Sequence, residues 1–246
     1  MTVTTASPLD GRALRDEMLA ELRATLDAAG RPAVTLGTVL VGADESARWA
    51  MRAKHDAADD VGIRTVGVDL PATATQEEVE REVARLAGDP TIHGIFVQLP
   101  HPAHVDAARI VELIPPERDI DGLTPDSPFT PASALAVLHL LARLGVDTTG
   151  RHVVIVGDSP YVAAPLARLL TGRASVTRVD AEASDIVEVC RRADIVVSAV
   201  ADAGLITPAH VGPGTTIIDV PTPGGVGPVT IAILLTHTAR AAGVGH

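Results

Sequence analysis

The stretch HVVIVGDSPYVAAPLARLLTG (152–172) indicates the fold class most directly. A run of β-branched residues leads to a glycine, and the residues that follow have the spacing of a helix. We expect a buried strand at 152–157 and a helix near 161–172. The same order of strand and helix recurs along the chain, which predicts an α/β protein with mainly parallel sheets covered by helices.

Short apolar runs and helical patterns alternate on both sides of this stretch. The other expected strands are 33–41, 63–70, 92–99, 175–180, 194–200 and 215–220, and the other expected helices are one ending at Gly30, 45–62, one following Thr75, 131–145, 184–192 and about 228–242. Thr75 and Glu78 have the spacing of a capping box.

The proline-rich segment 124–131 predicts a division into two α/β domains. We expect residues 1–128 to form the first domain, joined by a C-terminal helix at 226–246. Residues 129–225 are expected to form a reduced Rossmann-like domain. A length of 246 residues suits one large or two small domains.

Composition excludes several classes of protein. Apolar residues make up 46% and charged residues 21% of the chain, which is the balance of a folded globular protein. No apolar run is long enough to span a membrane and no secretory leader is recognisable, so we expect no membrane partner and a cytoplasmic location. A net charge of -11, with one Trp, one Tyr and two Phe, argues against nucleic acid as a partner. No histidine or cysteine spacing indicates a metal site.

Three polar residues are candidates for catalysis. Lys54 lies on the helix after the first strand, Gln98 ends an apolar strand, and Asp121 belongs to an Asp-Ile-Asp-Gly run. The carboxyl ends of parallel strands are where α/β proteins bind ligands, and a buried amide requires hydrogen-bond partners. Each residue also has a structural explanation, as a solvated lysine, a strand end and a turn carboxylate.

A glycine loop near the C-terminus is a fourth candidate. Glycines between two prolines leave no side chains to hinder a flat ligand, and the loop leads into the last helix, whose first amides attract electron-rich groups. A tight connector is the structural explanation. The loop consists of Pro223, Gly224, Gly225, Val226, Gly227 and Pro228.

Several motifs together resemble those of the bifunctional methylenetetrahydrofolate dehydrogenase/cyclohydrolase family. They are LDGR (9–12), LVG (40–42), KHDAADDVGI (54–63), VQLPHP (97–102), DIDG (119–122), HVVIVG (152–157), IIDV (217–220) and PGGVGPVT (223–230). They extend over most of the chain in the family's order, so the chain is identified as a shortened, divergent member. The resemblance implies a tetrahydrofolate derivative bound between a first α/β domain and a Rossmann-type domain that holds NADP.

The resemblance also implies roles for the candidate residues. Lys54 and Gln98 correspond to the family's catalytic lysine and glutamine, and Asp121 corresponds to its pterin-binding aspartate. A carboxylate is suited to pair with the aminopyrimidine edge of a pterin, and a lysine with a lowered pKa is suited to move protons. Pro100 and the glycine loop would border the folate.

One departure from the family pattern lies next to the lysine. The family has a tyrosine four residues before it, where this chain has Ala50. Trp49 is adjacent, but neighbouring helix positions point about 100° apart. We expect both residues to belong to the substrate site, without a hydroxyl to orient Lys54.

Other departures lie in the second domain, where the expected dinucleotide contacts are Gly157, Asp158, Ser159 and Asp180. Ala163 replaces the family's second glycine, which restricts the approach of a pyrophosphate. Asp158 would repel a 2′-phosphate, whereas Asp180 suits the ribose hydroxyls of NAD. These departures weaken the case for either dinucleotide as cofactor, and for NADP more than for NAD.

The loops after DIDGL and after IIDV are shorter than in the family, which removes residues beside the nicotinamide. From the kept folate residues and the altered cofactor residues we infer a non-redox step on 5,10-methylenetetrahydrofolate, most simply transfer of the methylene group to a small co-substrate. Two alternatives stay open. One is the family's dehydrogenase/cyclohydrolase activity with NAD or NADP, or its cyclohydrolase half alone; the other is a non-catalytic folate-binding protein. The resemblance further implies a homodimer.

Overall fold

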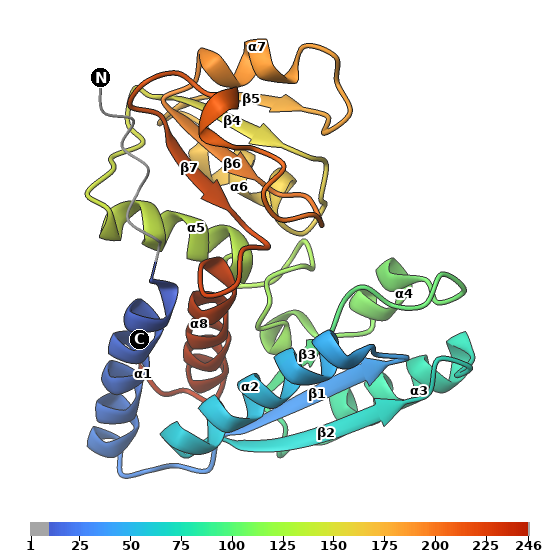
Figure 1. Ribbon diagram of the computed structural model, residues 1–246. Coiled ribbons are helices and arrows are strands. Elements are labelled where there is room, and N and C mark those ends of the chain that lie inside the picture. The colour runs from blue at the N-terminus through green and yellow to red at the C-terminus, as the bar shows by residue number, and fades with distance from the viewer. Residues whose placement is uncertain (1–9, 246) are drawn as a thin grey trace. The chain divides into compact units, whose positions relative to one another are not determined.

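The computed structural model describes residues 10–245 and confirms the α/β class (Figure 1). Residues 1–9 of the predicted first domain, including Leu9 of the LDGR motif, and His246 lie outside the described residues. The chain forms two compact units, and every strand pair in both is parallel. Residues 16–132 and 231–245 form the Lys54 unit, and residues 10–15 and 133–230 form the Gly157 unit.

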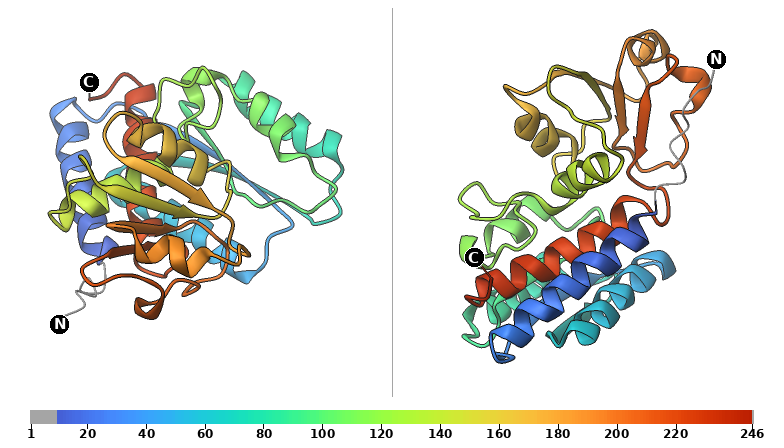
Figure 2. Two further views of the ribbon diagram at one scale, coloured as in Figure 1. Left: turned by 90° about the horizontal axis from the view of Figure 1, so that it is seen from above. Right: turned by 90° about the vertical axis from the view of Figure 1, so that its left-hand side faces the viewer.

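The Lys54 unit is built on a sheet with strand order β2-β1-β3. Its elements are most of α1 (Gly11–Ala28), β1 (Thr35–Val41), α2 (Glu45–Val61), β2 (Arg64–Leu70), α3 (Gln76–Gly88), β3 (Gly94–Val97), α4 (Ala107–Glu112), the short helix η1 (Pro116–Arg118) and most of α8 (Val226–Ala241). The central strand β1 is buried along its whole length, and its Val39 pairs with Val68 and Val97. Figure 2 shows α1 and α8 lying side by side, as Figure 1 does.

Local sequence signals explain where the helices of this unit begin. The turn after β1 contains Gly42 with φ 59°, and a Cβ there would lie 2.7 Å from the Cα of Ala72. Asp44 then caps α2 by accepting a hydrogen bond from the amide of Ala47 (2.7 Å). Thr75 and Glu78 form the predicted capping box at the start of α3, so that prediction is confirmed.

The Gly157 unit contains a parallel sheet with strand order β5-β4-β6-β7. Its elements are most of α5 (Ala132–Arg143), β4 (His152–Val156), α6 (Ala163–Leu170), β5 (Ser175–Val179), α7 (Ile186–Arg191), β6 (Ile195–Ser198), the short helix η2 (Pro208–His210) and β7 (Thr216–Asp219). Helix α6 packs on β4 and β5. Val154 and Val196 pair in register at the centre of the sheet, and both are fully buried.

The structure differs from the predicted elements in three places. The strand expected at 92–99 is confined to Gly94–Val97; the amide of Gln98 still donates to the carbonyl of Val39 (2.9 Å), and the chain bends at Leu99. The last helix begins at Val226 rather than near Pro228, so the second half of the glycine loop is the first turn of α8. The short helices α4, η1 and η2 were not expected, since six or fewer residues give little periodicity. None of the helices in residues 10–245 is long and apolar enough to cross a membrane.

Candidate active site

Lys54 is a buried lysine on α2. The residue is only 8% exposed, which is unusual for a lysine on a surface helix. The Nζ atom lies 4.7 Å from the ring centroid of Phe96 and donates a hydrogen bond to Oε1 of Gln98 (3.2 Å). A longer contact of 3.5 Å joins Nζ to the carbonyl oxygen of Ala50, one helical turn earlier.

Strand β3 and the residue after it carry the side chains that contact this amine. Phe96 and Gln98 are two residues apart, so both side chains leave the same face of the strand. The Nε2 atom of Gln98 donates to the carbonyl of Leu99 (2.7 Å), which leaves Oε1 as the atom that faces Lys54. The ammonium is therefore held by an aromatic face and one amide oxygen.

The two aspartates of the DIDG segment differ in their hydrogen bonds. Asp119 is 1% exposed and accepts hydrogen bonds from the amides of Gly122 (3.1 Å) and Thr124 (2.6 Å), and from the Thr124 hydroxyl (2.8 Å). Gly122 has φ 72°, and a Cβ there would lie 2.7 Å from the carbonyl oxygen of Phe129. Among the described residues, none donates a hydrogen bond to the carboxylate of Asp121. Asp119 thus builds the turn, whereas the carboxylate of Asp121 receives no hydrogen bond from the described residues.

Burial brings the pKa values of Lys54 and Asp121 close together. Burial lowers the pKa of Lys54 from its usual 10.5 to about 8, although the nearby Asp121 carboxylate acts in the opposite direction. Burial, and then repulsion from Asp119, raises the pKa of Asp121 from its usual 3.8 to about 7, although Lys54 acts in the opposite direction. Both side chains can therefore gain or lose a proton near neutral pH.

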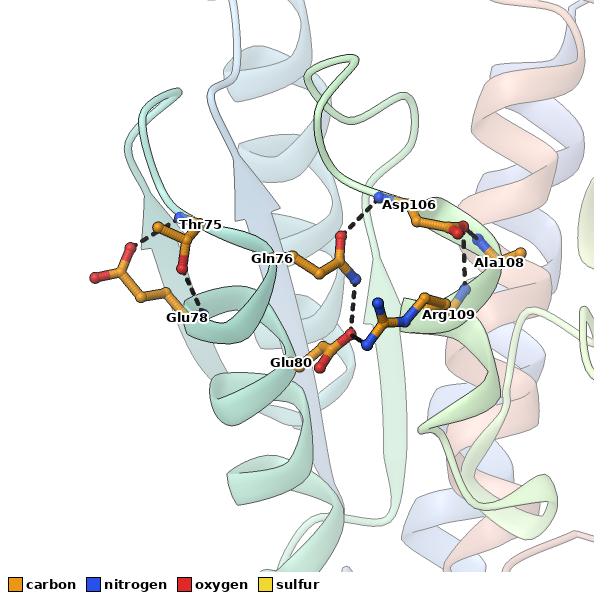
Figure 3. A network of polar contacts seen from close by, with 7 residues as sticks. All are labelled: Thr75, Gln76, Glu78, Glu80, Asp106, Ala108 and Arg109. Carbon is orange, nitrogen blue, oxygen red and sulfur yellow. Dashed lines mark hydrogen bonds and ion pairs between the residues drawn. The ribbon is translucent and has the colours of Figure 1, made fainter.

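The segment that follows β3 is anchored at its far end to α3 (Figure 3). The amide of Asp106 donates to Oε1 of Gln76 (2.7 Å), and Nε2 of Gln76 donates to Glu80 (2.9 Å). Arg109 of α4 pairs with the same Glu80 oxygen at 2.7 Å. Because this network ties α4 to α3, the segment that begins with Gln98 is fixed at both ends.

Three other predicted substrate residues lie in the same unit. Ala50 is half-buried and places only a methyl group one turn before Lys54. Trp49 is 64% exposed, so it does not fill the space beside Lys54 within this unit. Pro100 is exposed and follows Leu99 through a cis peptide bond. Their part in substrate binding stays a prediction.

The glycine loop lies in the Gly157 unit and contacts the LDGR motif. The amide of Gly11 donates to the carbonyl of Gly224 (2.8 Å), and a Cβ on Gly11 would lie 1.9 Å from the carbonyl oxygen of Gly225. Gly224 has φ 84° and lies against the guanidinium of Arg12. Gly11 therefore cannot be replaced without moving the loop. The remaining loop residues divide between exposed Pro223 and Gly227, half-buried Pro228 and buried Val226.

The predicted dinucleotide contacts lie at the carboxyl ends of β4 and β5. Gly157 has φ 101°, and a Cβ there would lie 2.9 Å from the carbonyl oxygen of Ala199. Asp158 is exposed and pairs with Arg178, while Asp180 is exposed and accepts a hydrogen bond from the amide of Glu182 (2.8 Å). Ser159 Oγ accepts a hydrogen bond from the amide of Tyr161 (3.3 Å).

Helix α6 offers few amides to a ligand at its start. No side chain caps this helix, but the amide of Ala164 already donates to the carbonyl of Ser159 (3.2 Å), and Pro165 has no amide hydrogen. The methyl group of Ala163 is fully buried. Its effect on the approach of a pyrophosphate stays a prediction.

Two buried polar atoms at the same edge have no partner among the described residues. They are Oγ of Ser198, at the end of β6, and Oδ1 of Asp219, at the end of β7. The two residues pair in register, so their side chains leave the same face of the sheet. A hydroxyl beside a carboxylate oxygen complements a carboxamide, which both accepts and donates. Elsewhere in residues 10–245, no group of three or more His, Cys, Asp and Glu is arranged to hold a metal ion.

Comparisons with known proteins match both halves of the chain. Residues 9–121 match the family described as the catalytic domain of tetrahydrofolate dehydrogenase/cyclohydrolase, and residues 131–221 match its NAD(P)-binding domain. The bifunctional protein FolD of Methanoculleus marisnigri is 36% identical over 271 aligned positions, with 95% of each chain covered. That of Geobacillus thermodenitrificans is 37% identical, with 84% of this chain and 86% of the relative covered.

The chain belongs to the tetrahydrofolate dehydrogenase/cyclohydrolase family. This is a family of enzymes, and the chain is an enzyme of it. Because the alignment of 271 positions is longer than the 246-residue chain, the relative has segments that this chain lacks.

Solved structures agree with the family assignment. The Trypanosoma brucei methylenetetrahydrofolate dehydrogenase-cyclohydrolase, solved with NADP and an inhibitor, has a TM-score of 0.87, 31% identity and coverage of 94% of this chain and 95% of that one. A methylenetetrahydrofolate dehydrogenase from Bombyx mori has a TM-score of 0.84, 34% identity and coverage of 96% and 97%. The comparisons support the dehydrogenase/cyclohydrolase alternative better than non-redox transfer.

The structure also identifies residues that the sequence did not indicate. Phe96 contacts Lys54, Arg12 lies against the glycine loop, and His237 contacts the DIDG segment from α8. Phe96 was obscured within an apolar strand, although its position two residues before Gln98 was a usable signal. His237 is 117 residues from its partner Ile120, and no local pattern reveals such a contact.

Proposed function

We propose that the protein is a methylenetetrahydrofolate dehydrogenase/methenyltetrahydrofolate cyclohydrolase. The observation that carries the proposal is the hydrogen bond from a buried Lys54 to Gln98, beside an Asp121 carboxylate to which no residue of 10–245 donates a hydrogen bond. Burying a lysine opposes folding, so an amine of this kind indicates chemistry rather than structural support.

Asp121 is assigned to substrate orientation. A pterin presents an amino group and a ring N–H side by side, and a carboxylate accepts hydrogen bonds from both. The pKa of Asp121 lies near 7. The donors of a bound ligand and a charged Lys54 both favour the ionised carboxylate, which is the form that accepts these hydrogen bonds. The family's folate specificity is thereby assigned to a residue with no structural task of its own.

Lys54 and Gln98 are assigned to the hydrolytic step. Water adds to the carbon that bridges two nitrogen atoms in the methenyl cation, and neutral Lys54 takes the proton from this water. The bond from this carbon to one nitrogen then breaks, the hydroxyl loses its proton, and that nitrogen gains one. The products are 10-formyltetrahydrofolate and one released proton. Gln98 holds the Lys54 amine in place through Oε1.

The residues of the Gly157 unit fit a nicotinamide dinucleotide. Gly157 and Asp180 would hold its adenosine and phosphate parts, and the unpartnered atoms of Ser198 and Asp219 would suit its carboxamide. When bound, the dinucleotide supplies the hydride acceptor for the dehydrogenase step. Asp158 and Asp180 place two carboxylates where NADP would bring a further phosphate, so we propose NAD as the preferred form.

The family resemblance also suggests a homodimer formed through the second domain, with folate and a dinucleotide as the small-molecule partners. Multi-angle light scattering on the purified protein tests this assembly. A mass of one chain at micromolar concentration would contradict it.

Methylene transfer to a small co-substrate is the second candidate. It is favoured by Ala50, which leaves Lys54 without a neighbouring hydroxyl, and by the direct passage from β7 into the glycine loop. Non-redox chemistry would use the same folate residues, with a nucleophile instead of a dinucleotide as the second substrate.

One set of assays separates these functions. Purified protein is given 5,10-methylenetetrahydrofolate with NAD, with NADP or with neither, and separately 5,10-methenyltetrahydrofolate alone. Reduced dinucleotide together with 10-formyltetrahydrofolate is the expected result. Hydrolysis without reduction identifies the cyclohydrolase half alone. Consumption of the methylene compound only when a nucleophilic acceptor is added identifies transfer, and folate binding without any turnover identifies a binding protein.

A further inference from the structure

The last helix contributes a buried histidine to the segment that carries Asp121. His237 of α8 is 3% exposed, and its Nδ1 lies 2.8 Å from the carbonyl oxygen of Ile120. A carbonyl oxygen only accepts hydrogen bonds, so Nδ1 carries the proton. The ring also stacks on Phe129, with the centroids 4.8 Å apart and an angle of 28° between the rings.

This hydrogen bond acts on the peptide group that leads into Asp121. The Ile120 carbonyl and the Cα of Asp121 belong to one planar unit, so holding the carbonyl sets the direction in which the Asp121 side chain leaves the backbone. On the other side, the Asp121 carbonyl accepts a hydrogen bond from the amide of Ala132 (3.1 Å). The backbone of Asp121 is held on both flanks, while its carboxylate accepts no hydrogen bond from the part of the chain that the structure describes.

The Ile120 side chain is held independently of His237. Ile120 is fully buried, and a Cβ on Gly94 would lie 2.7 Å from its Cγ2 and 3.0 Å from Oγ1 of Thr238. Strand β3, the DIDG segment and α8 therefore meet in close contact around Gly94. Because this packing remains when the His237 ring is changed, loss of the ring's hydrogen bond is expected to loosen the carbonyl without unfolding the unit.

We propose that His237 is a positioning residue for Asp121, and that through the Ile120 carbonyl it sets the site's affinity for a ring that presents adjacent N–H donors. The class of ring, a pterin, rests on the proposed function. The positioning itself is a property of the ligand-free protein. Burial lowers the pKa of the His237 ring, which favours the neutral form, and the contact with the Ile120 carbonyl places the proton of that form on Nδ1.

Three substitutions separate the hydrogen bond from the bulk of the ring. H237N keeps a donor at the position of Nδ1, H237Q moves the amide donor one carbon further out, and H237L removes the donor. The matched control is H139L, at an exposed histidine of α5. In H237L and H237Q we expect the KM for methenyltetrahydrofolate to rise about tenfold, with kcat within about threefold of wild type. In H237N and H139L we expect both constants within about twofold of wild type.

A second measurement does not depend on activity. Loosening the segment exposes the Asp121 carboxyl to water, so in ligand-free protein its pKa should fall by about one unit or more in H237L and H237Q, followed by NMR of labelled aspartate, and stay unchanged in H237N. If H237L does not fold, H237N against H237Q decides. An Asp121 pKa that is equal in wild type, H237N and H237Q overturns the inference. If the pKa values differ as stated but wild type turns over no folate, the positioning role stands and the proposed function fails.

Discussion

Replacing Lys54 with methionine should stabilise the protein at neutral pH while removing its activity. Methionine has nearly the length of lysine without the amine, so the apolar stem continues to pack on Phe96. The charge that burial disfavours is lost. If Lys54 is catalytic and its burial destabilises the fold, its removal should raise stability and lower turnover.

The magnitude follows from the pKa of Lys54. Each pH unit between the usual 10.5 and the folded value of about 8 corresponds to about 1.4 kcal/mol, so holding the charged amine in the fold is unfavourable by about 3 kcal/mol. Below pH 8 the lysine is protonated in both states, and the penalty is fully present. Between pH 8 and 10.5 the unfolded chain binds more protons than the folded one, so the stability of wild type rises with pH. Above 10.5 the penalty is gone.

The substitution also has an unfavourable part. Oε1 of Gln98 loses its donor, which opposes the gain by about 1 kcal/mol. The net expectation at pH 7 is a K54M variant more stable than wild type by about 2 kcal/mol, shrinking to zero or below by about pH 10. The exposed Arg52 on the same helix supplies the control, because R52M should change stability by less than about 0.5 kcal/mol at either pH.

Urea unfolding at pH 7 and pH 10, followed by circular dichroism, measures the difference. Methenyltetrahydrofolate hydrolysis by K54M should fall by about a thousandfold in the same preparations. A K54M protein that is less stable than wild type at pH 7, or a difference that is equal at both pH values, would refute the assignment of Lys54 as a buried, strained amine.

Three further predictions concern activity. The kcat/KM for hydrolysis should rise with pH through the values of about 7 and 8 at which Asp121 and Lys54 lose protons, and a flat profile would exclude Lys54 as the base. D158A should raise kcat/KM for NADP relative to NAD by about tenfold, whereas E188A, which removes an exposed carboxylate that pairs with an arginine in the same unit, should change this ratio by less than about twofold. A50Y should raise hydrolysis by about tenfold by placing a phenol one turn before Lys54; a fall in hydrolysis would show that the alanine is adapted to another reaction.

Local signals in the sequence were sufficient for the main elements but not for their ends. The Thr75–Glu78 capping box works because both partners lie within one helical turn, so sequence spacing alone describes it. The side chain of Gln98 bonds to Lys54 and to the Leu99 carbonyl, which are tertiary and loop contacts that periodicity does not record. Short helices such as Ala107–Glu112 are stabilised by caps and packing rather than by a repeating pattern.

The candidate site was predictable where a motif carries its own geometry. In DIDG, the glycine and the first aspartate make a turn within four residues, and this turn frees Asp121. The contact of His237 with Ile120 has no such local cause, because it depends on how α8 packs against β3. Burial likewise decides the pKa values of Lys54 and Asp121, and the burial of a side chain cannot be predicted from its neighbours in the sequence.

In the proposed function, hydride transfer and hydrolysis use different residues of this molecule. One activity can therefore be lost while the other is kept. Removing a hydride from the methylene compound requires an acceptor but no base, whereas hydrolysis of the methenyl cation requires proton transfer and no dinucleotide. Lys54, Gln98 and Asp121, to which we assign proton transfer and orientation, all lie in the Lys54 unit. More of the departures from the family lie around β4, β5 and β7, although Ala50 and the shortened loop after DIDGL lie in the Lys54 unit. If one activity is weakened in this protein, we therefore expect it to be hydride transfer. The ratio of the rate of hydrolysis to the rate of NAD reduction, measured in a single preparation, tests this expectation.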